Sequence, residues 1–199
     1  MLRINKLRVI LVILAIALAV LPVHLHADEA LDARLSRGEI IITSRAIAGS
    51  DLPEVTVQAV VDTSPAKMWK IIDDCTHYKQ NMQRVANSKE LSRKGNVVVC
   101  EVEIELPFPL SNLTGVTEAT HVVGPPTWSR TWKLIRGDYE KNTGSWTLSA
   151  FDAEGKRTRA TYKIHVIPKS NVPNALLRKA QRESLPKLIE HLREITKGR

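Results

Sequence analysis

Apolar and polar residues alternate along most of the chain beyond residue 53, and this pattern predicts half-buried β-strands. The first clear stretch covers residues 54–61, in which Val55, Val57 and Ala59 alternate with more polar positions. Six further stretches of this kind cover residues 85–93, 97–106, 113–123, 127–135, 143–151 and 157–167. Turn sequences rather than helices separate these six stretches, so the pattern predicts an antiparallel meander and not a parallel sheet.

Two short helices are predicted between the first strand and the meander. Thr63 or Ser64 can cap a helix whose first position is Pro65, a residue that suits the start of a helix. The apolar side of this helix consists of Met68, Trp69, Ile71 and Ile72. We expect the second short helix to cover residues 77–82.

The C-terminal segment predicts one long helix that begins near Pro173. Apolar or small residues recur along it at steps of three or four, namely Leu177, Ala180, Ser184, Leu188, Leu192 and Ile195. Pro186 lies inside this helix and is expected to bend it, because proline removes a backbone hydrogen bond. The apolar stripe can be buried only against the concave face of the sheet, which predicts an α+β fold: a curved antiparallel sheet of about seven strands wrapped round the helix.

Residues 1–27 have the pattern of a signal peptide. A basic start precedes an uninterrupted apolar run over residues 9–23, which is short for a membrane span of about 20 residues. Ala27 is the expected residue before cleavage, which leaves an N-terminal segment, 28–51, and one domain, 52–196. The chain is therefore expected to be exported, to the periplasm or outside the cell; the alternative is a protein anchored by an uncleaved N-terminal segment.

The charge distribution argues against a nucleic-acid partner. The net charge of +8 includes three basic residues of the first 27, and the remaining positive residues are scattered among acids, except along the C-terminal segment. No basic motif interleaved with aromatic residues occurs. We expect no nucleic-acid binding.

Cys75 and Cys100 are the two cysteines of the chain. In an exported protein an even number of cysteines permits a disulfide, and the alternative is a pair of buried thiols that pack as small apolar groups. Neither a CxxC motif nor a Cys/His metal spacing is present.

Candidate catalytic residues are few. His77, His121, His165 and His191 lie far apart in the sequence and show no paired-ligand spacing, so we expect no metal, and we expect no cofactor. Glu101, Glu103 and Glu105 alternate with Val102 and Ile104, which places these carboxylates on the outward face of a strand. An acid or base needs a site that shifts its pKa, and an outward face does not provide one.

Aromatic residues supply the candidate binding site. One strand carries Trp128, Arg130 and Trp132 on the same face, the next strand carries Trp146, and the strand after that carries Tyr162. If these faces point inward, they enclose a large volume with few polar atoms, as a pocket for an apolar ligand requires. The alternative is a filled core with Arg130 facing water; if Arg130 points inward, it pairs with an acid, stacks on an indole or contacts a ligand.

The turn over residues 106–110, in the stretch ELPFPLSN, is unusually apolar for a connection between strands. Phe108 either lies at the lip of a pocket, contacts a membrane, or is buried in the core.

The order of these elements resembles the START-like, or SRPBCC, superfamily, which has a helix-grip fold and includes polyketide cyclases, coenzyme Q-binding proteins and lipid transfer domains. The stretches that carry the resemblance are VDTSPAKMWKIIDDCTHYKQNMQRVANSKEL, ELPFPLSN, GSWTLSAF, RATYKIHVIPKSNVPNALLRKA and SLPKLIEHLRE. Many relatives carry an Arg-Asp pair after the Pro-aromatic-Pro-Leu-Ser turn, whereas this chain has Asn112 and Leu113 there.

The resemblance implies a deep apolar cavity between the sheet and the C-terminal helix that holds a lipid, sterol, quinone or polyketide. The expected lining is Trp128, Arg130, Trp132, Trp146, Tyr162, Phe108, Leu177, Ala180, Ser184 and Leu188. Binding or transfer of a hydrophobic small molecule, with a transient membrane contact, is favoured over catalysis. The alternatives are a cyclase or aromatase acting on a hydrophobic substrate, and an interaction module with a filled core.

Overall fold

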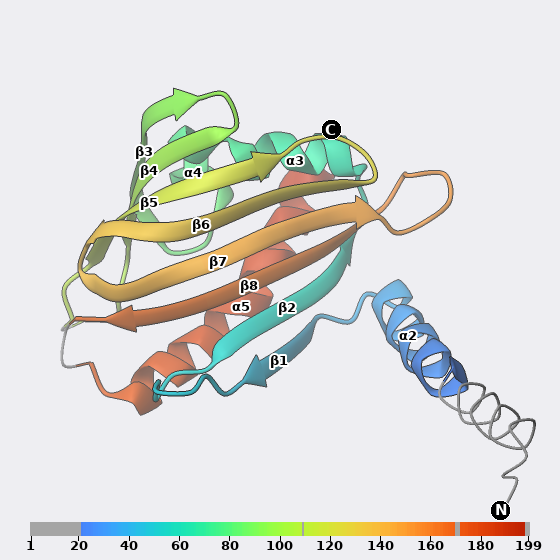
Figure 1. The fold of residues 1–199 in the computed structure, drawn as a ribbon, viewed down its shortest axis with the longest axis horizontal. Coiled ribbons are helices and arrows are strands. Elements are labelled where there is room, and N and C mark those ends of the chain that lie inside the picture. Colours follow the sequence, from blue (N-terminus) through green and yellow to red (C-terminus); the bar gives the residue numbers. More distant parts are fainter. Residues whose placement is uncertain (1–20, 109, 170–171, 198–199) are drawn as a thin grey trace, which may run out of the picture. The chain divides into compact units, whose positions relative to one another are not determined.

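The computed structural model of the protein describes residues 21–108, 110–169 and 172–197 (Figure 1). Contacts within the chain divide it into two units, residues 1–39 and 40–199, and each unit is described by itself.

The first unit contains one described helix, α2 (Leu21–Ser36), which runs through the expected cleavage position at Ala27. After the helix, Glu39 accepts hydrogen bonds from Arg34 and Arg37 at 2.8 and 2.9 Å. Residues 1–20, which form most of the predicted signal peptide, lie outside the described residues. Among the helices of the described ranges, none is both long enough and apolar enough to cross a membrane.

The second unit is built on a single antiparallel sheet of eight strands in the order β1-β2-β8-β7-β6-β5-β4-β3. The strands are β1 (Ile41–Arg45), β2 (Glu54–Val61), β3 (Val85–Lys94), β4 (Val97–Ile104), β5 (Leu113–Val122), β6 (Thr127–Gly137), β7 (Tyr139–Ala150) and β8 (Thr158–Pro168). Figure 1 shows that the sheet curves over the long helix α5 (Asn174–Thr196), which crosses one of its faces. This arrangement confirms the predicted fold class.

Two details of the sheet differ from the prediction. The strand β1 lies in the segment that was expected to precede the domain, and it was missed because only Ile41 of its five residues is buried. Strand β7 begins at Tyr139, inside a stretch predicted to be a turn. The turn is short because Gly137 has a φ of 131°, and a Cβ there would lie 2.3 Å from the carbonyl oxygen of Thr114.

Helices α3 (Pro65–Asp73), η1 (Cys75–His77) and α4 (Tyr78–Asn81) lie between β2 and β3. Helices α3 and α4 correspond to the two short helices that the sequence predicted, and η1 is a further short turn between them. The hydroxyl of Ser64 accepts a hydrogen bond from the backbone N–H of Lys67, which caps α3.

The main apolar core lies between the sheet, α3 and the C-terminal half of α5. From the helices, Met68 and Ile72 pack with Leu188, Ile189 and Leu192. The sheet contributes Val55, Val57, Ala59, Val61, Trp146, Leu148 and Ala160. Helix α5 continues through Pro186, and its buried residues lie from Leu185 onward, whereas none of its residues from 174 to 184 is buried. The two halves of α5 therefore have different surroundings.

Candidate ligand-binding pocket

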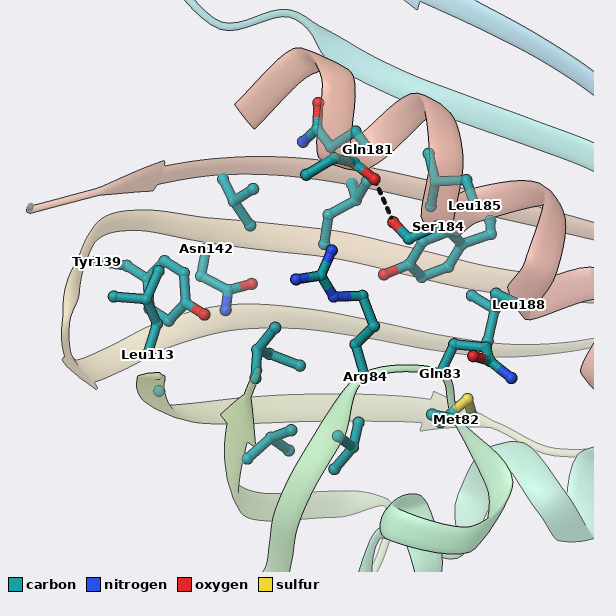
Figure 2. Close-up of a pocket in the computed structure, with 18 of the residues that line it drawn as sticks. Met82, Gln83, Arg84, Leu113, Tyr139, Asn142, Gln181, Ser184, Leu185 and Leu188 are labelled. Atoms are coloured by element: carbon teal, nitrogen blue, oxygen red, sulfur yellow. Dashed lines mark hydrogen bonds between the residues drawn. The ribbon is translucent and has the colours of Figure 1, made fainter. Parts of the chain in front are cut away.

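A cavity of about 280 Å³ lies between the inner face of the sheet and the part of α5 from Leu177 to Leu188 (Figure 2). Strands β4 to β8 supply its floor and walls, and the segment between α4 and β3 supplies Met82, Gln83 and Arg84 at one side. Most of the lining residues are aliphatic or aromatic. The cavity is therefore suited to an apolar ligand.

Three aromatic side chains form the central part of the lining. The ring centres of Trp146 and Tyr162 lie 4.5 Å apart, and those of Trp132 and Tyr162 lie 5.9 Å apart in a stacked arrangement. The register of the sheet explains this cluster, because Trp146 faces Tyr162 across β7 and β8. Trp132 lies opposite Gly144, where an added Cβ would be 2.3 Å from the indole ring. Because Gly144 has no side chain, the indole of Trp132 can occupy this space.

The structure brings most of the predicted site residues together. The residues that line the cavity are Arg130, Trp132, Trp146, Tyr162, Leu177, Ala180, Ser184 and Leu188. Trp128 is half-buried outside the lining and packs against the main core, opposite the fully buried Leu148 on β7. Phe108 also lies outside the lining and is 97 % exposed. Whether the lining residues contact a ligand stays a prediction.

Arg130 points inward and is only 3 % exposed. Its Nη1 lies 2.8 Å from Nε2 of His121, and its Nη2 donates to Sγ of Cys100 at 3.1 Å. The guanidinium carbon also lies 5.7 Å from the ring centre of Tyr78. The direct partners of this buried cation are thus a histidine, a sulfur and an aromatic ring, in place of the acid or indole that the sequence suggested.

His121 connects Arg130 to the carboxylate of Asp73. Nδ1 of His121 lies 3.0 Å from Oδ1 of Asp73, and Asp73 also accepts a hydrogen bond from Arg93 at 2.9 Å. Because an arginine can only donate, Nε2 of His121 accepts from Arg130 and the ring proton lies on Nδ1, facing Asp73. Burial, with a further contribution from the positive charge of Arg130, lowers the pKa of His121 to about 4. The imidazole is therefore neutral at neutral pH.

The structure joins Cys75 and Cys100 in a disulfide, one of the two states that the sequence left open. This bond links η1 to β4 directly behind Arg130, and both cysteines are fully buried. Burial also raises the pKa of the Tyr78 and Tyr162 hydroxyl groups, so both remain protonated near neutral pH.

Sequence reasoning missed several of the polar side chains of the cavity. Arg84, Asn142 and Gln181 all belong to the lining, and the Asn142 side chain accepts a hydrogen bond from Nε1 of Trp132 at 3.0 Å. Arg84 lies in the irregular segment between α4 and β3, where no periodic pattern indicates which side chains point inward. Among the residues that the structure describes, no group of three or more His, Cys, Asp or Glu side chains is placed to hold a metal ion.

The comparisons with known proteins agree with this geometry. Residues 61–193 match the family described as polyketide cyclase / dehydrase and lipid transport, and the chain belongs to this family. No curated protein sequence matches the chain.

Several solved structures share the fold. A STAR-related lipid transfer protein from Xanthomonas axonopodis is 23 % identical, with a TM-score of 0.66 over 77 % of this chain and 93 % of that one. Human StAR-related lipid transfer protein 5 is 12 % identical, with a TM-score of 0.64 over 84 % of this chain and 91 % of that one. The Zhui aromatase/cyclase from a Streptomyces species is 10 % identical, with a TM-score of 0.55 over 71 % and 88 %. The protein thus has the START-like, helix-grip fold.

Proposed function

We propose that this protein binds an apolar ligand of the lipid, sterol, quinone or polyketide kind in the cavity beneath α5 and carries it unchanged. The observation that supports the proposal most directly is the cavity of about 280 Å³ with its largely aliphatic and aromatic lining. A core that was merely filled would leave no such space, because protein interiors pack at nearly crystalline density. The names of two structural relatives, both lipid transfer proteins, agree with this proposal.

The arrangement around His121 favours binding over catalysis. A histidine that acts as general base needs a free ring nitrogen within reach of the substrate. Here Nε2 is occupied by Arg130, Nδ1 faces Asp73, and His121 is not part of the cavity lining. The Asp73–His121–Arg130 chain therefore orients a buried guanidinium and presents no base to the cavity.

Access to the cavity is proposed to involve the first half of α5. Leu177 and Ala180 line the cavity but are not fully buried, whereas Ile189 and Leu192 in the second half pack in the main core. Pro186 separates these two halves and removes one backbone hydrogen bond of the helix. The first half can therefore move outward while the second half stays packed.

The proposed function is tested by a substitution that fills the cavity and leaves the residues of the main core unchanged. Ala180 lines the cavity, and replacing it with tryptophan adds a large side chain to that space. Ala175 lies on the same helix but is exposed and outside the lining, so Ala175→Trp is the matched control. Each purified variant is examined by native mass spectrometry and lipid extraction, and by titration with the neutral apolar dye Nile red.

We expect Ala180→Trp to abolish dye and lipid binding with an unchanged circular dichroism spectrum, and Ala175→Trp to bind like the parent protein. If Ala180→Trp binds as well as the parent, the ligand does not occupy this cavity. If it unfolds, as an overpacked core would, the space is part of the core and the proposal is wrong.

We also propose that the protein is exported and that it contacts a membrane transiently. The basic and apolar pattern of residues 1–27 supports export, and N-terminal sequencing of the exported protein should then begin near Asp28. A retained Met1 in the membrane fraction would instead indicate an anchored protein. Membrane contact is supported by Phe108, which is almost fully exposed two residues from Leu106, a lining residue of the cavity.

A further inference from the structure

The charged residues of the cavity are all of one sign. Among the described lining residues, the ionised side chains are those of Arg84 and Arg130, and the lining contains no aspartate, glutamate or lysine. A positive charge next to an apolar cavity attracts an anion, because charges interact more strongly where water is partly excluded. The two arginines therefore bear on which apolar ligands the cavity accepts.

The guanidinium groups of Arg84 and Arg130 differ in which of their nitrogens already have hydrogen-bond partners. Arg130 is buried, and both of its terminal nitrogens already have partners in His121 and Cys100. Arg84 is half-buried, and its Nε and Nη2 both donate to one backbone oxygen, that of Glu105, at 3.0 and 2.7 Å. These two bonds fix the guanidinium plane and leave Nη1 of Arg84 to a further acceptor.

The direction of the Arg84 side chain also points to a ligand. Figure 2 shows it extending from the residue before β3 into the cavity, where Asn142 and Gln181 also contribute polar atoms. Arg84 has a φ of 62°. Among the described residues other than glycine, it is the only one with a positive φ. This conformation costs a residue with a Cβ roughly 1 kcal/mol or more, and such strain is typical of functional positions.

We propose that the cavity accepts amphipathic ligands that end in a carboxylate, and that Arg84 binds this carboxylate through its open Nη1 edge. A carboxylate is a compact anionic end group, which suits a cavity of about 280 Å³. Asn142 and Gln181 can donate amide hydrogens to the same group, and the aromatic and aliphatic lining holds the apolar chain. This inference rests on the proposed function, since it specifies the ligand of the same cavity.

The test uses displacement of Nile red from the full chain by three ligands with the same alkyl chain: dodecanoate, dodecanol and dodecylamine, which are anionic, neutral and cationic at neutral pH. We expect dodecanoate to displace the dye at a concentration about 10- to 100-fold lower than dodecanol, as one charge-assisted hydrogen-bonding site provides. Dodecylamine should be the weakest competitor. This order needs no variant and is measured on the parent protein.

Variants then assign the preference to a residue. Arg84→Gln is first shown by circular dichroism to be folded, and its own affinity for Nile red is measured. It should then lose the preference for dodecanoate over dodecanol. The control is Arg182→Gln, which removes an exposed arginine of α5 outside the lining and should keep the preference.

The outcomes separate the two proposals. If Nile red does not bind, or if Ala180→Trp does not affect its binding, the proposed function fails. If the dye binds to this cavity but dodecanoate displaces it no better than dodecanol does, the proposed preference for a carboxylate is wrong. The same holds if neither ligand displaces the dye. If the preference survives in Arg84→Gln, another cation such as Arg130 is responsible and the role of Arg84 is wrong.

Discussion

The neutral state of His121 predicts a specific loss of stability in acid. Burial is the main cause of its lowered pKa, and the positive charges of Arg130 and Arg93 act in the same direction. Asp73 and Glu90 oppose them, since a nearby carboxylate favours the protonated imidazole. The net result is a pKa of about 4 in the folded protein against 6.5 for an unperturbed histidine.

The size of the expected stability loss follows from the difference between the folded and unfolded pKa values of His121. Between pH 6.5 and 4 the unfolded chain binds a proton at His121 that the folded protein does not, so the free energy of unfolding falls as the pH is lowered through this interval. At about 1.36 kcal/mol for each pH unit of difference, the loss amounts to about 3 kcal/mol. Above pH 6.5 the contribution is fully present, and below pH 4 no further loss arises from this residue.

The perturbation that isolates this effect is His121→Gln. A glutamine oxygen can accept from Arg130 and its amide can donate toward Asp73, but the side chain does not titrate. Groups that do not contact His121 contribute equally to both proteins and cancel in the comparison. Urea unfolding of the parent and the variant is measured at intervals from about pH 7.5 to about pH 4.

We expect the stability difference between the two proteins to be constant above about pH 7 and to shift by about 3 kcal/mol in favour of His121→Gln as the pH falls to about 4. Nuclear magnetic resonance of the His121 ring should show the neutral, Nδ1-protonated form throughout most of this range. Parallel stability curves, or a His121 ring that titrates near the ordinary histidine pKa of about 6.5, would refute the reasoning.

Replacing Cys75 and Cys100 together with serine should lower the free energy of unfolding by about 3 kcal/mol, since the bond closes a loop of 25 residues; urea unfolding measures this, and a thiol count of two in the denatured, unreduced parent would show that no bond forms. Gly144→Ala should displace the Trp132 indole and disturb the pairing of β7 with β8, because the added Cβ would lie 2.3 Å from the indole and 2.4 Å from the carbonyl oxygen of Lys163; we expect a cost of about 1–3 kcal/mol or more and a changed near-ultraviolet circular dichroism spectrum, and unchanged stability and spectrum would contradict this. Phe108→Ser should leave stability within about 0.5 kcal/mol but weaken binding to lipid vesicles in a flotation assay, because Phe108 is 97 % exposed; equal flotation would argue against membrane contact.

Much of the fold could be predicted from the sequence because its signals are local. Ser64 and Pro65 mark the start of α3, and the alternation of residues 97–104 shows which face of β4 is inward. The strand β1 lacked such a signal. It is short and mostly exposed, and it forms because β2 offers it an edge with which to pair.

The candidate site could be predicted only in its regular parts. Trp132, Trp146 and Tyr162 follow the period of their strands, and Ala180 follows that of the helix. The inward aim of Arg84 depends on a left-handed backbone conformation, which the sequence did not indicate for an arginine. Position along a strand also matters. Trp128 points to the same side of β6 as Arg130 and Trp132, but it lies over the packed core.

The open sheet has a consequence for how the protein behaves in a crowded solution. Strand β3 is the last in the sheet order and offers an edge that another chain could join. Two irregularities interrupt its register with β4, one between Val85 and Asn87 and one between Glu90 and Ser92. Lys89 and Lys94 are exposed along the same strand. Breaks and like charges of this kind discourage edge-to-edge pairing, so the β3 edge of the sheet is protected against aggregation without a partner that covers it.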